Sequence, residues 1–468
     1  MTLSHKRRPL ALLLPRPVGP SVKTICGADT RKPLCQWSTA MSYRSLGFFA
    51  DPFSNKALQA DDEGEKLIVD RDSEVNKLVR RIQESDKVPT LEGPNGVGKT
   101  SIINIALHRV FLQSKLEKGD PMFIPCRCPF QLSKDKDVEE FLDEFYLQVA
   151  LTLVESADVL RPPPGYTKAP IEASIKNYIQ SPIIRNYTGS ILGNGLGFGG
   201  TPNSGKGWER IGFRAAIGSW LKLLFPKSEA GAVVCVIDNL EILQSSGKAK
   251  ETIEALRDTA FAIGGIKWIL CGSSGVVRGI ASSSRLAGWL QKPINVGELR
   301  EEVGGEVYDK RVKTFRKNEQ AELPLTRDNF ITLFDMFNGN SRFALDEAGA
   351  FCTWIFDEVD NLSEIPSDSF ERWLREELET NYDEIFVFFR DRDEEAFKAI
   401  CQLEIFVPKD CSELGFDDVT EFLEILERFQ NYGLVTPTLD QNTPVDTVYE
   451  ISPKSLKLQY FLDSQEER

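Results

Sequence analysis

The chain has 468 residues, enough for about three domains of ordinary size, and 41% of them are hydrophobic, so it can bury a sizeable core. No apolar run approaches the roughly 20 residues that cross a membrane, which excludes a helical membrane protein. The net charge is −14, and residues 391–468 alone hold 18 acidic and 7 basic residues, a net of −11. This acidic end argues against a nucleic-acid-binding surface there, because such surfaces are normally basic.

Residues 1–40 have a different composition from the rest of the chain. They contain seven basic residues against one acidic residue, five prolines, and no helical or strand period. One interpretation is a basic organellar presequence, since such segments contain few acids, but prolines oppose the amphipathic helix that a presequence needs. We favour a disordered or non-native extension, with Met41 rather than Met1 as the physiological start.

The nine cysteines do not predict a metal site. Cys126 and Cys128 form the only close pair, no second pair stands at zinc-ligand spacing, and the two histidines, His5 and His108, are far apart. Without a secretion signal, the expected state is reduced cysteines in a cytoplasmic protein.

The first regular patterns occur before residue 112. Residues 48–60 are typical of an extended segment with a proline turn. A helix with apolar residues at i, i+3, i+4 and i+7 is predicted from Val75 to Ile82. A short strand over 87–92 and a helix over 101–111 follow, on either side of a glycine-rich loop.

That loop reads G-x-x-x-x-G-K-T, the phosphate-binding loop of P-loop NTPases. The glycines let successive backbone N–H groups turn toward the β- and γ-phosphates, and the helix N-terminus adds a favourable dipole. The lysine supplies a positive charge to the phosphates, and the threonine hydroxyl is a ligand for Mg²⁺. ATP and Mg²⁺ are therefore the expected cofactors. The predicted binding residues are Gly93, Pro94, Asn95, Gly96, Val97, Gly98, Lys99, Thr100 and Ser101.

Further strands and helices alternate along the chain, which predicts an α/β fold with a parallel sheet and helices on both faces. The irregular stretch 161–208, with a glycine-rich part over 189–207, is an insert whose role stays open. The apolar runs over 231–238 and 266–271 predict fully buried parallel strands. The expected strands are 87–92, 122–128, 231–238 and 266–271, and the expected helices are 138–154, 249–263, 328–337, 341–357 and 367–382.

Asp238 ends one buried strand, where a Walker B acid would hold Mg²⁺ opposite Thr100. The next residue is Asn239, and an asparagine can position a water but cannot accept its proton. Glu241 is the better candidate for the general base, and slow hydrolysis is expected. Ser273 or Ser274, after the strand over 266–271, would face the γ-phosphate if that strand lies between the P-loop strand and the Walker B strand.

Several motifs in order resemble AAA+ ATPases of the origin-recognition type and the related archaeal and bacterial signal-transduction ATPases. The resemblance rests on Asp-Pro-Phe at 51–53, the segment 69–74, the P-loop, Ile-Asp-Asn-Leu-Glu at 237–241 and Gly-Asn-Ser-Arg at 339–342. It implies that Val69 and Arg71 border the adenine and that Arg342, on the lid, senses the γ-phosphate. Two positions depart from the pattern: Ser341 replaces a proline, and Asp70 replaces a glycine.

Arg278 and Arg285 follow the strand over 266–271, where these families often carry an arginine that reaches a neighbouring subunit. The resemblance therefore leaves a homo-oligomer open. The alternative is that both arginines are surface residues with no role in a neighbouring subunit.

The C-terminal pattern of helix, helix, Gly-Leu-Val, polar hairpin and strand is similar to a winged helix, a module that grips DNA in origin-recognition proteins. The helix that would enter the groove, over 417–428, has five acidic residues and one arginine. Phosphates would repel it, which favours a protein partner over DNA. The expected domains are a P-loop core over 48–300, a helical lid over 301–382 and a winged helix over 385–468.

Two functions are consistent with these patterns. One is a slow, nucleotide-operated switch or assembly ATPase whose acidic winged helix contacts a protein. The other is a DNA-binding ATPase of the replication-initiator or mobile-element kind.

Overall fold

The computed structural model describes residues 42–116, 121–133, 137–160, 172–173, 175, 210–243, 246–281, 283–359, 361–390, 392–403, 405–439 and 444–466. The chain divides into two units, Met1–Ala40 and Met41–Arg468. The first unit and the glycine-rich stretch 189–207 lie outside the described residues, so the expectations for them stay predictions. The following description concerns the second unit.

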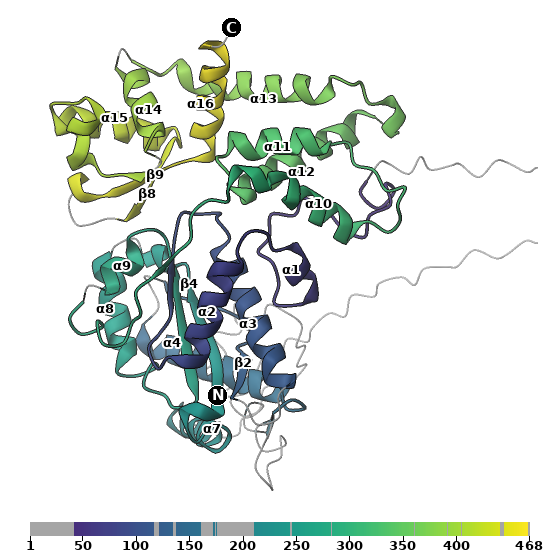
Figure 1. The fold of residues 1–468 in the computed structure, drawn as a ribbon. Coiled ribbons are helices and arrows are strands. Elements are labelled where there is room, and N and C mark those ends of the chain that lie inside the picture. The colour runs from purple at the N-terminus through teal and green to yellow at the C-terminus, as the bar shows by residue number, and fades with distance from the viewer. Residues whose placement is uncertain are drawn as a thin grey trace, which may run out of the picture. The chain divides into compact units, whose positions relative to one another are not determined.

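A parallel sheet forms the centre of the N-terminal half of this unit (Figure 1). Its strand order is β2-β4-β5-β1-β6, and β3 also pairs with β4. The strand that precedes the P-loop, β1, is separated from β4 by β5, so the condition set above for the strand over 266–271 is met. The predicted P-loop NTPase sheet is therefore confirmed. The strands are β1 (Thr90–Glu92), β2 (Met122–Pro125), β3 (Phe130–Gln131), β4 (Gly231–Asp238), β5 (Ile266–Gly272) and β6 (Ile294–Asn295).

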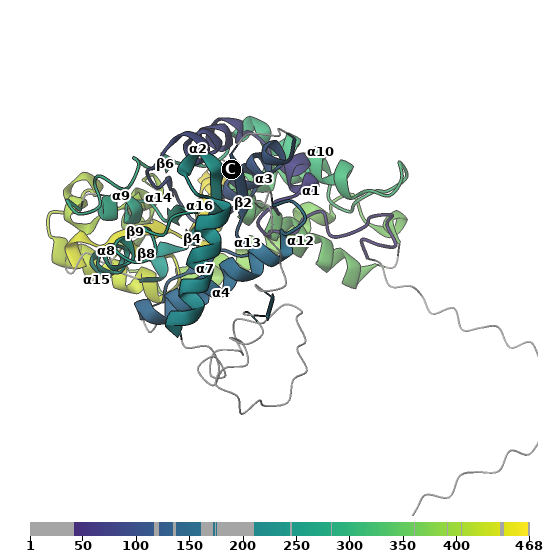
Figure 2. The same cartoon turned by 90° about the horizontal axis from the view of Figure 1, so that it is seen from below.

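Helices cover both faces of the sheet. All eight residues of β4 are buried, and alternate side chains enter opposite cores: Cys235 and Ile237 pack with α4, α7 and α8, whereas Val234 and Val236 pack with α2 and α3. Figure 2 shows α2 and α3 on one side of β2 and β4, and α4 and α7 on the other. These helices are α2 (Asp72–Glu84), α3 (Lys99–Leu116), α4 (Val138–Glu155), α7 (Arg210–Leu224), α8 (Ser246–Arg257) and α9 (Val276–Ala281).

Local sequence explains where two of these helices begin and which face they bury. Asp137 caps α4 through a capping box: its side chain accepts the Glu140 N–H, and Glu140 reaches back to the Asp137 N–H. In α2 the buried residues are the four that the periodicity predicted, from Val75 to Ile82. The apolar spacing therefore fixed the orientation of α2 toward α3.

A helical lid follows the sheet. Its aromatic core includes Phe330, Phe334 and Phe351. Phe53, from the segment before the sheet, stacks on Phe330 with ring centroids 6.0 Å apart, so this N-terminal segment packs with the lid. The lid helices are α10 (Gly304–Phe315), α11 (Arg327–Met336), α12 (Ser341–Glu358) and α13 (Ser369–Phe386), and the short α1 (Asp62–Leu67) contacts α10.

The C-terminal part has its own antiparallel sheet, with strand order β7-β9-β8. The two predicted helices and the hairpin follow one another, with an additional short strand between the helices, and the winged helix stays a prediction. A final helix, α16 (Pro453–Glu466), was not predicted, and it packs against α13 (Figure 1). The other elements are α14 (Asp393–Cys401), β7 (Ile405–Phe406), α15 (Val419–Asn431), β8 (Val435–Leu439) and β9 (Val448–Ile451). In the part of the chain that the structure describes, no helix is both long and apolar enough to span a bilayer.

Candidate functional site

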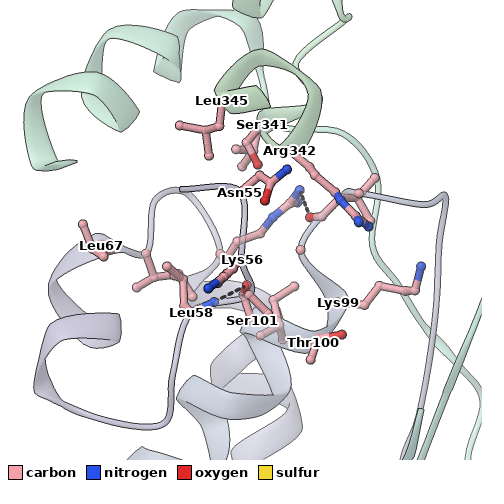
Figure 3. A pocket seen from close by; sticks show the side chains of 18 of the residues that line it. Asn55, Lys56, Leu58, Leu67, Lys99, Thr100, Ser101, Ser341, Arg342 and Leu345 are labelled. Carbon is pink, nitrogen blue, oxygen red and sulfur yellow. Dashed lines mark hydrogen bonds between the residues drawn. The ribbon is translucent and has the colours of Figure 1, made fainter. Parts of the chain in front are cut away.

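A cavity of about 390 Å³ lies where the P-loop, the N-terminal segment and the lid meet. Its size is in the range of small-molecule sites. Figure 3 shows Ser341, Arg342 and Leu345 from the lid on one side and Lys99, Thr100 and Ser101 on the other. Every predicted P-loop residue from Asn95 to Ser101 lines it, as do Val69, Arg71 and Asn239.

Two glycines allow the P-loop to adopt its shape. Gly96 has a φ of +87°, in the left-handed region where a Cβ is strained, and a Cβ there would also lie 2.6 Å from Oδ1 of Asn340. A Cβ on Gly93 would lie 2.0 Å from the carbonyl oxygen of Val296. Gly96 is therefore needed for the turn, and Gly93 is needed because the backbone of Val296 lies close to it.

Lys99 is buried and folded back onto the loop that precedes it. Its Nζ donates hydrogen bonds to the carbonyl oxygens of Gly93, at 2.9 Å, and Pro94, at 2.8 Å. The ammonium group is thus held beside the loop, where phosphate oxygens would compete with two carbonyls for its protons.

Thr100 and Asp238 meet at the ends of α3 and β4. The Thr100 hydroxyl donates to Oδ2 of Asp238 at 2.8 Å, while Oδ1 accepts the Asn239 N–H at 2.9 Å. Asp238 is only 4% exposed. A hydroxyl and a carboxylate in contact beside a phosphate loop fit the hard oxygen ligands that Mg²⁺ prefers, so these two residues could hold the ion.

Asn239 and Glu241 occupy different positions relative to the cavity. Asn239 lines it, with a φ of +58°. Glu241 is not among the lining residues, and its Oε2 accepts the Ser273 N–H at 3.0 Å. The Ser273 side chain is fully buried, and its Oγ has no hydrogen-bond partner. Glu241 therefore holds the end of β5, and the predicted roles of Glu241 and Ser273 toward a phosphate stay predictions.

The segment over 69–74 lies beside the P-loop, and its predicted place next to the adenine stays a prediction. Val69 is buried, and Arg71 donates from Nη2 to the carbonyl oxygens of Val97 at 3.1 Å and Gly297 at 2.6 Å. Burial lowers the pKa of Arg71. Arg71 therefore ties this segment to the loop.

Asp70, which stands where the pattern of the resembled ATPases has a glycine, occupies a backbone conformation that favours glycine. Its φ is +51°, and Arg300 forms a bidentate pair with its carboxylate, with distances of 2.8 and 2.7 Å. The hydrogen bond from Arg300 lowers the pKa of Asp70.

The lid contacts the P-loop through the turn before α12. Asn340 is 3% exposed, and its Nδ2 donates to the carbonyl oxygen of Asn95 at 3.0 Å. Its buried Oδ1 has no hydrogen-bond partner. Arg342, two residues later, is exposed and lines the cavity, and its predicted role toward a γ-phosphate stays a prediction. The sequence pattern gave no role to Asn340, although it belongs to the Gly-Asn-Ser-Arg turn, nor to Lys56 and Arg311, which line the cavity.

Arg278 and Arg285 both have partners within the chain. Arg278 pairs with Glu92 at 2.5 Å, and its side chain is 67% exposed. Arg285 pairs with Glu254 at 3.3 Å and Asp258 at 3.1 Å. These ion pairs lie outside the cavity, so a role of either arginine in a neighbouring subunit stays a prediction.

No protein-family model and no curated protein sequence matches this chain. Among solved structures, it is similar to a Walker-type ATPase of Pyrococcus abyssi, with 16% identity, coverage of 87% of this chain and 99% of that chain, and a TM-score of 0.41. It is also similar to the Aeropyrum pernix ORC1 protein in complex with DNA, with 10% identity, coverage of 88% and 99%, and a TM-score of 0.43.

A further similar structure is Cdc6p from Pyrobaculum aerophilum, with 13% identity, coverage of 90% and 99%, and a TM-score of 0.37. At these identities and TM-scores the likenesses do not define a family for this chain. The resemblance to AAA+ ATPases of the origin-recognition type rests instead on the sequence motifs, while the strand order and the contact of Thr100 with Asp238 fit a P-loop NTPase.

Proposed function

We propose that this chain binds ATP with Mg²⁺ in the cavity between P-loop and lid and hydrolyses it slowly. The observation that carries the proposal is the contact of the Thr100 hydroxyl with Asp238 at 2.8 Å, beside the buried Lys99. In such a site the lysine and the bound Mg²⁺ offset the charge of the β- and γ-phosphates, and Arg342 approaches the γ-phosphate from the lid.

The positions of Asn239 and Glu241 support slow hydrolysis. The residue after Asp238, Asn239, lines the cavity and is an amide, which cannot take the proton of an attacking water. The carboxylate of Glu241, two residues further on, does not line the cavity, and its Oε2 accepts a backbone N–H from Ser273. Water activation is therefore expected to limit the rate.

The nucleotide state is proposed to reach the C-terminal part through the lid. Asn340 joins the lid to the P-loop, and Glu347 of α12 pairs with Lys457 of α16 at 2.5 Å. A smaller cavity of about 170 Å³ is lined by P-loop, lid and C-terminal residues together, including Asn95, Phe343 and Ser452. A movement of the lid relative to the P-loop would therefore also change the packing of β9 and α16.

The C-terminal part is proposed to contact a protein rather than DNA. On α15, Glu424 and Glu427 are exposed, and Glu421 pairs with Arg392 at 2.8 Å. An acidic helix gains nothing from the release of counterions that drives binding to DNA, whereas it complements a basic protein surface.

The test is the ATPase rate and the oligomeric mass of the full chain, with and without duplex DNA, at low and moderate salt. We expect slow, Mg²⁺-dependent hydrolysis that DNA does not change and that Lys99→Ala abolishes. Charge reversal in Glu424→Lys/Glu427→Lys is the matched variant: it should acquire salt-sensitive DNA binding that the wild type lacks. Hydrolysis stimulated by DNA in the wild type would instead establish the replication-type alternative.

A further inference from the structure

Two cysteines on neighbouring strands lie side by side, away from the nucleotide cavity. Cys126 directly follows β2, and Cys235 is in the middle of β4. Pro125 is in register with Val234, and the Cys126 N–H donates to the Val234 carbonyl oxygen at 2.8 Å, so the parallel ladder continues to the level of the two cysteines.

The spacing of the two strands suits a covalent link. Neighbouring strands lie about 4.8 Å apart, inside the roughly 4.4–6.8 Å range of Cα separations that disulfides span. Residues in register on parallel strands point to the same face of the sheet, and both cysteines pack against the core that α4 covers. Cys128, two residues after Cys126, is not at the level of Cys235 on the neighbouring strand, so it is not placed to form the same link.

The two thiols differ in pKa and in exposure, which assigns them different roles in an oxidation reaction. A hydrogen bond from Cys235, then one from Thr152 and backbone N–H groups, lower the pKa of Cys126; the Thr152 hydroxyl lies 3.6 Å from its sulfur. Burial raises the pKa of Cys235 well above its ordinary value and that of Cys128 to about 12. Cys126 is partly exposed, whereas Cys235 is fully buried. The lowered pKa of Cys126 and the partial exposure of the residue make it the better candidate for the attacking thiol.

These thiols have no evident metal role. Among the residues that the structure describes, no group of three or more His, Cys, Asp or Glu is arranged to hold a metal ion. Thiol oxidation is the chemistry that a pair of adjacent thiols supports without a metal.

We propose that Cys126 and Cys235 are a redox pair that a hydroperoxide converts into a reversible disulfide between β2 and β4. The Cys126 thiolate attacks the peroxide, the O–O bond breaks, and the products are a sulfenic acid and one molecule of water or alcohol. The Cys235 thiol then attacks the sulfenic sulfur and displaces water. Two thiols and one hydroperoxide thus give one disulfide, one water and one water or alcohol. This chemistry does not depend on nucleotide binding.

The full-length folded chain is the test sample. It is treated with hydrogen peroxide, its remaining thiols are alkylated, and its tryptic peptides are mapped by mass spectrometry without reduction. Trypsin cleaves after Arg127 and so separates Cys126 from Cys128. We expect a linked peptide pair containing Cys126 and Cys235 that is lost after dithiothreitol, while the buried Cys352 remains alkylatable on unfolding.

Three variants sharpen the result. In Cys235→Ser, Cys126 should stop at the sulfenic acid, which dimedone traps, and in Cys126→Ser, Cys235 should remain reduced. Cys128→Ser is the matched control and should still form the link. The proposal is overturned if Cys126 stays reduced in the folded wild type, if it pairs with Cys128, or if Cys352 oxidises as fast as Cys126.

Discussion

The two sides of the nucleotide cavity are held in different ways. On the phosphate side, α3 packs on the sheet that contains β4, and Thr100 already contacts Asp238. The lid side comes from far along the chain: Asn340 reaches the carbonyl of Asn95, 245 residues away, and Arg342 is exposed. A nucleotide therefore meets a phosphate site fixed by the sheet and a lid that contacts the P-loop itself through Asn340. We expect substitutions on the phosphate side to abolish nucleotide binding. Substitutions on the lid side should instead change how the bound nucleotide affects the lid and the C-terminal part.

The largest effect is expected from Lys99→Ala. The substitution removes the only P-loop ammonium, and a charge-assisted contact to phosphate is lost. ATP affinity should fall at least about tenfold, which corresponds to about 1.4 kcal/mol. Isothermal titration calorimetry of the wild type and the variant measures this change in ATP affinity.

The matched control is Lys56→Ala, which removes an exposed lysine that lines the same cavity from the N-terminal segment. A smaller loss is expected, because Lys56 does not belong to the phosphate loop. Equal affinities of wild type and Lys99→Ala would contradict the assignment of the phosphate side.

Next in size is the loss of hydrolysis in Asp238→Asn. Removing the carboxylate weakens the Mg²⁺ site, so kcat should fall by about tenfold or more, and chelation of Mg²⁺ should reproduce the loss in the wild type. Glu241→Gln should slow hydrolysis more than Asn239→Ala does, if Glu241 is the base. Wild-type rates in Glu241→Gln together with no activity in Asn239→Ala would reverse that assignment.

The sequence predicted those parts of the site that local pattern determines. An unbroken apolar run identified β4, and its final aspartate was placed beside Thr100 because parallel strands end at one edge of the sheet. The contact of Asn340 with Asn95 was missed, since no local pattern specifies which distant carbonyl an amide meets. The pairing of Arg278 with Glu92 was missed for the same reason.

Helix α16 shows a different limit. Its apolar residues do not gather on one stripe, because it packs against α13 and also against the C-terminal core, where Leu458 is fully buried. A helix that buries more than one face lacks the simple period that predicts a surface helix.

A smaller effect is expected where the two sides of the cavity join. Asn340→Ala removes the hydrogen bond to the carbonyl of Asn95 and should lower the free energy of unfolding by about 1 kcal/mol, measured by urea denaturation without nucleotide. Asn340→Asp is the matched variant: it keeps the shape but replaces the donor with an acceptor, so it should cost more. If the lid is held by other contacts, both variants will unfold like the wild type.

The smallest effect is expected at Asp70, on the rim of the cavity. Its φ of +51° favours glycine by roughly 1 kcal/mol over other residues, so Asp70→Gly should be more stable than Asp70→Ala by about that amount. The glycine variant also loses the pair with Arg300, which is largely exposed and contributes little. Thermal unfolding of the two variants and the wild type at neutral pH gives the comparison.

The pH dependence separates the backbone effect from the ion pair. Arg300 lowers the pKa of Asp70 in the folded chain, so the pair stabilises the fold above the ordinary pKa of an aspartate and its contribution is lost as the pH falls through the lowered value. Wild type should therefore lose stability relative to Asp70→Gly on acidification, whereas the difference between Asp70→Gly and Asp70→Ala, which comes from the backbone, should not change. If the stability difference between Asp70→Gly and Asp70→Ala changed with pH, it would not come from the backbone conformation of residue 70.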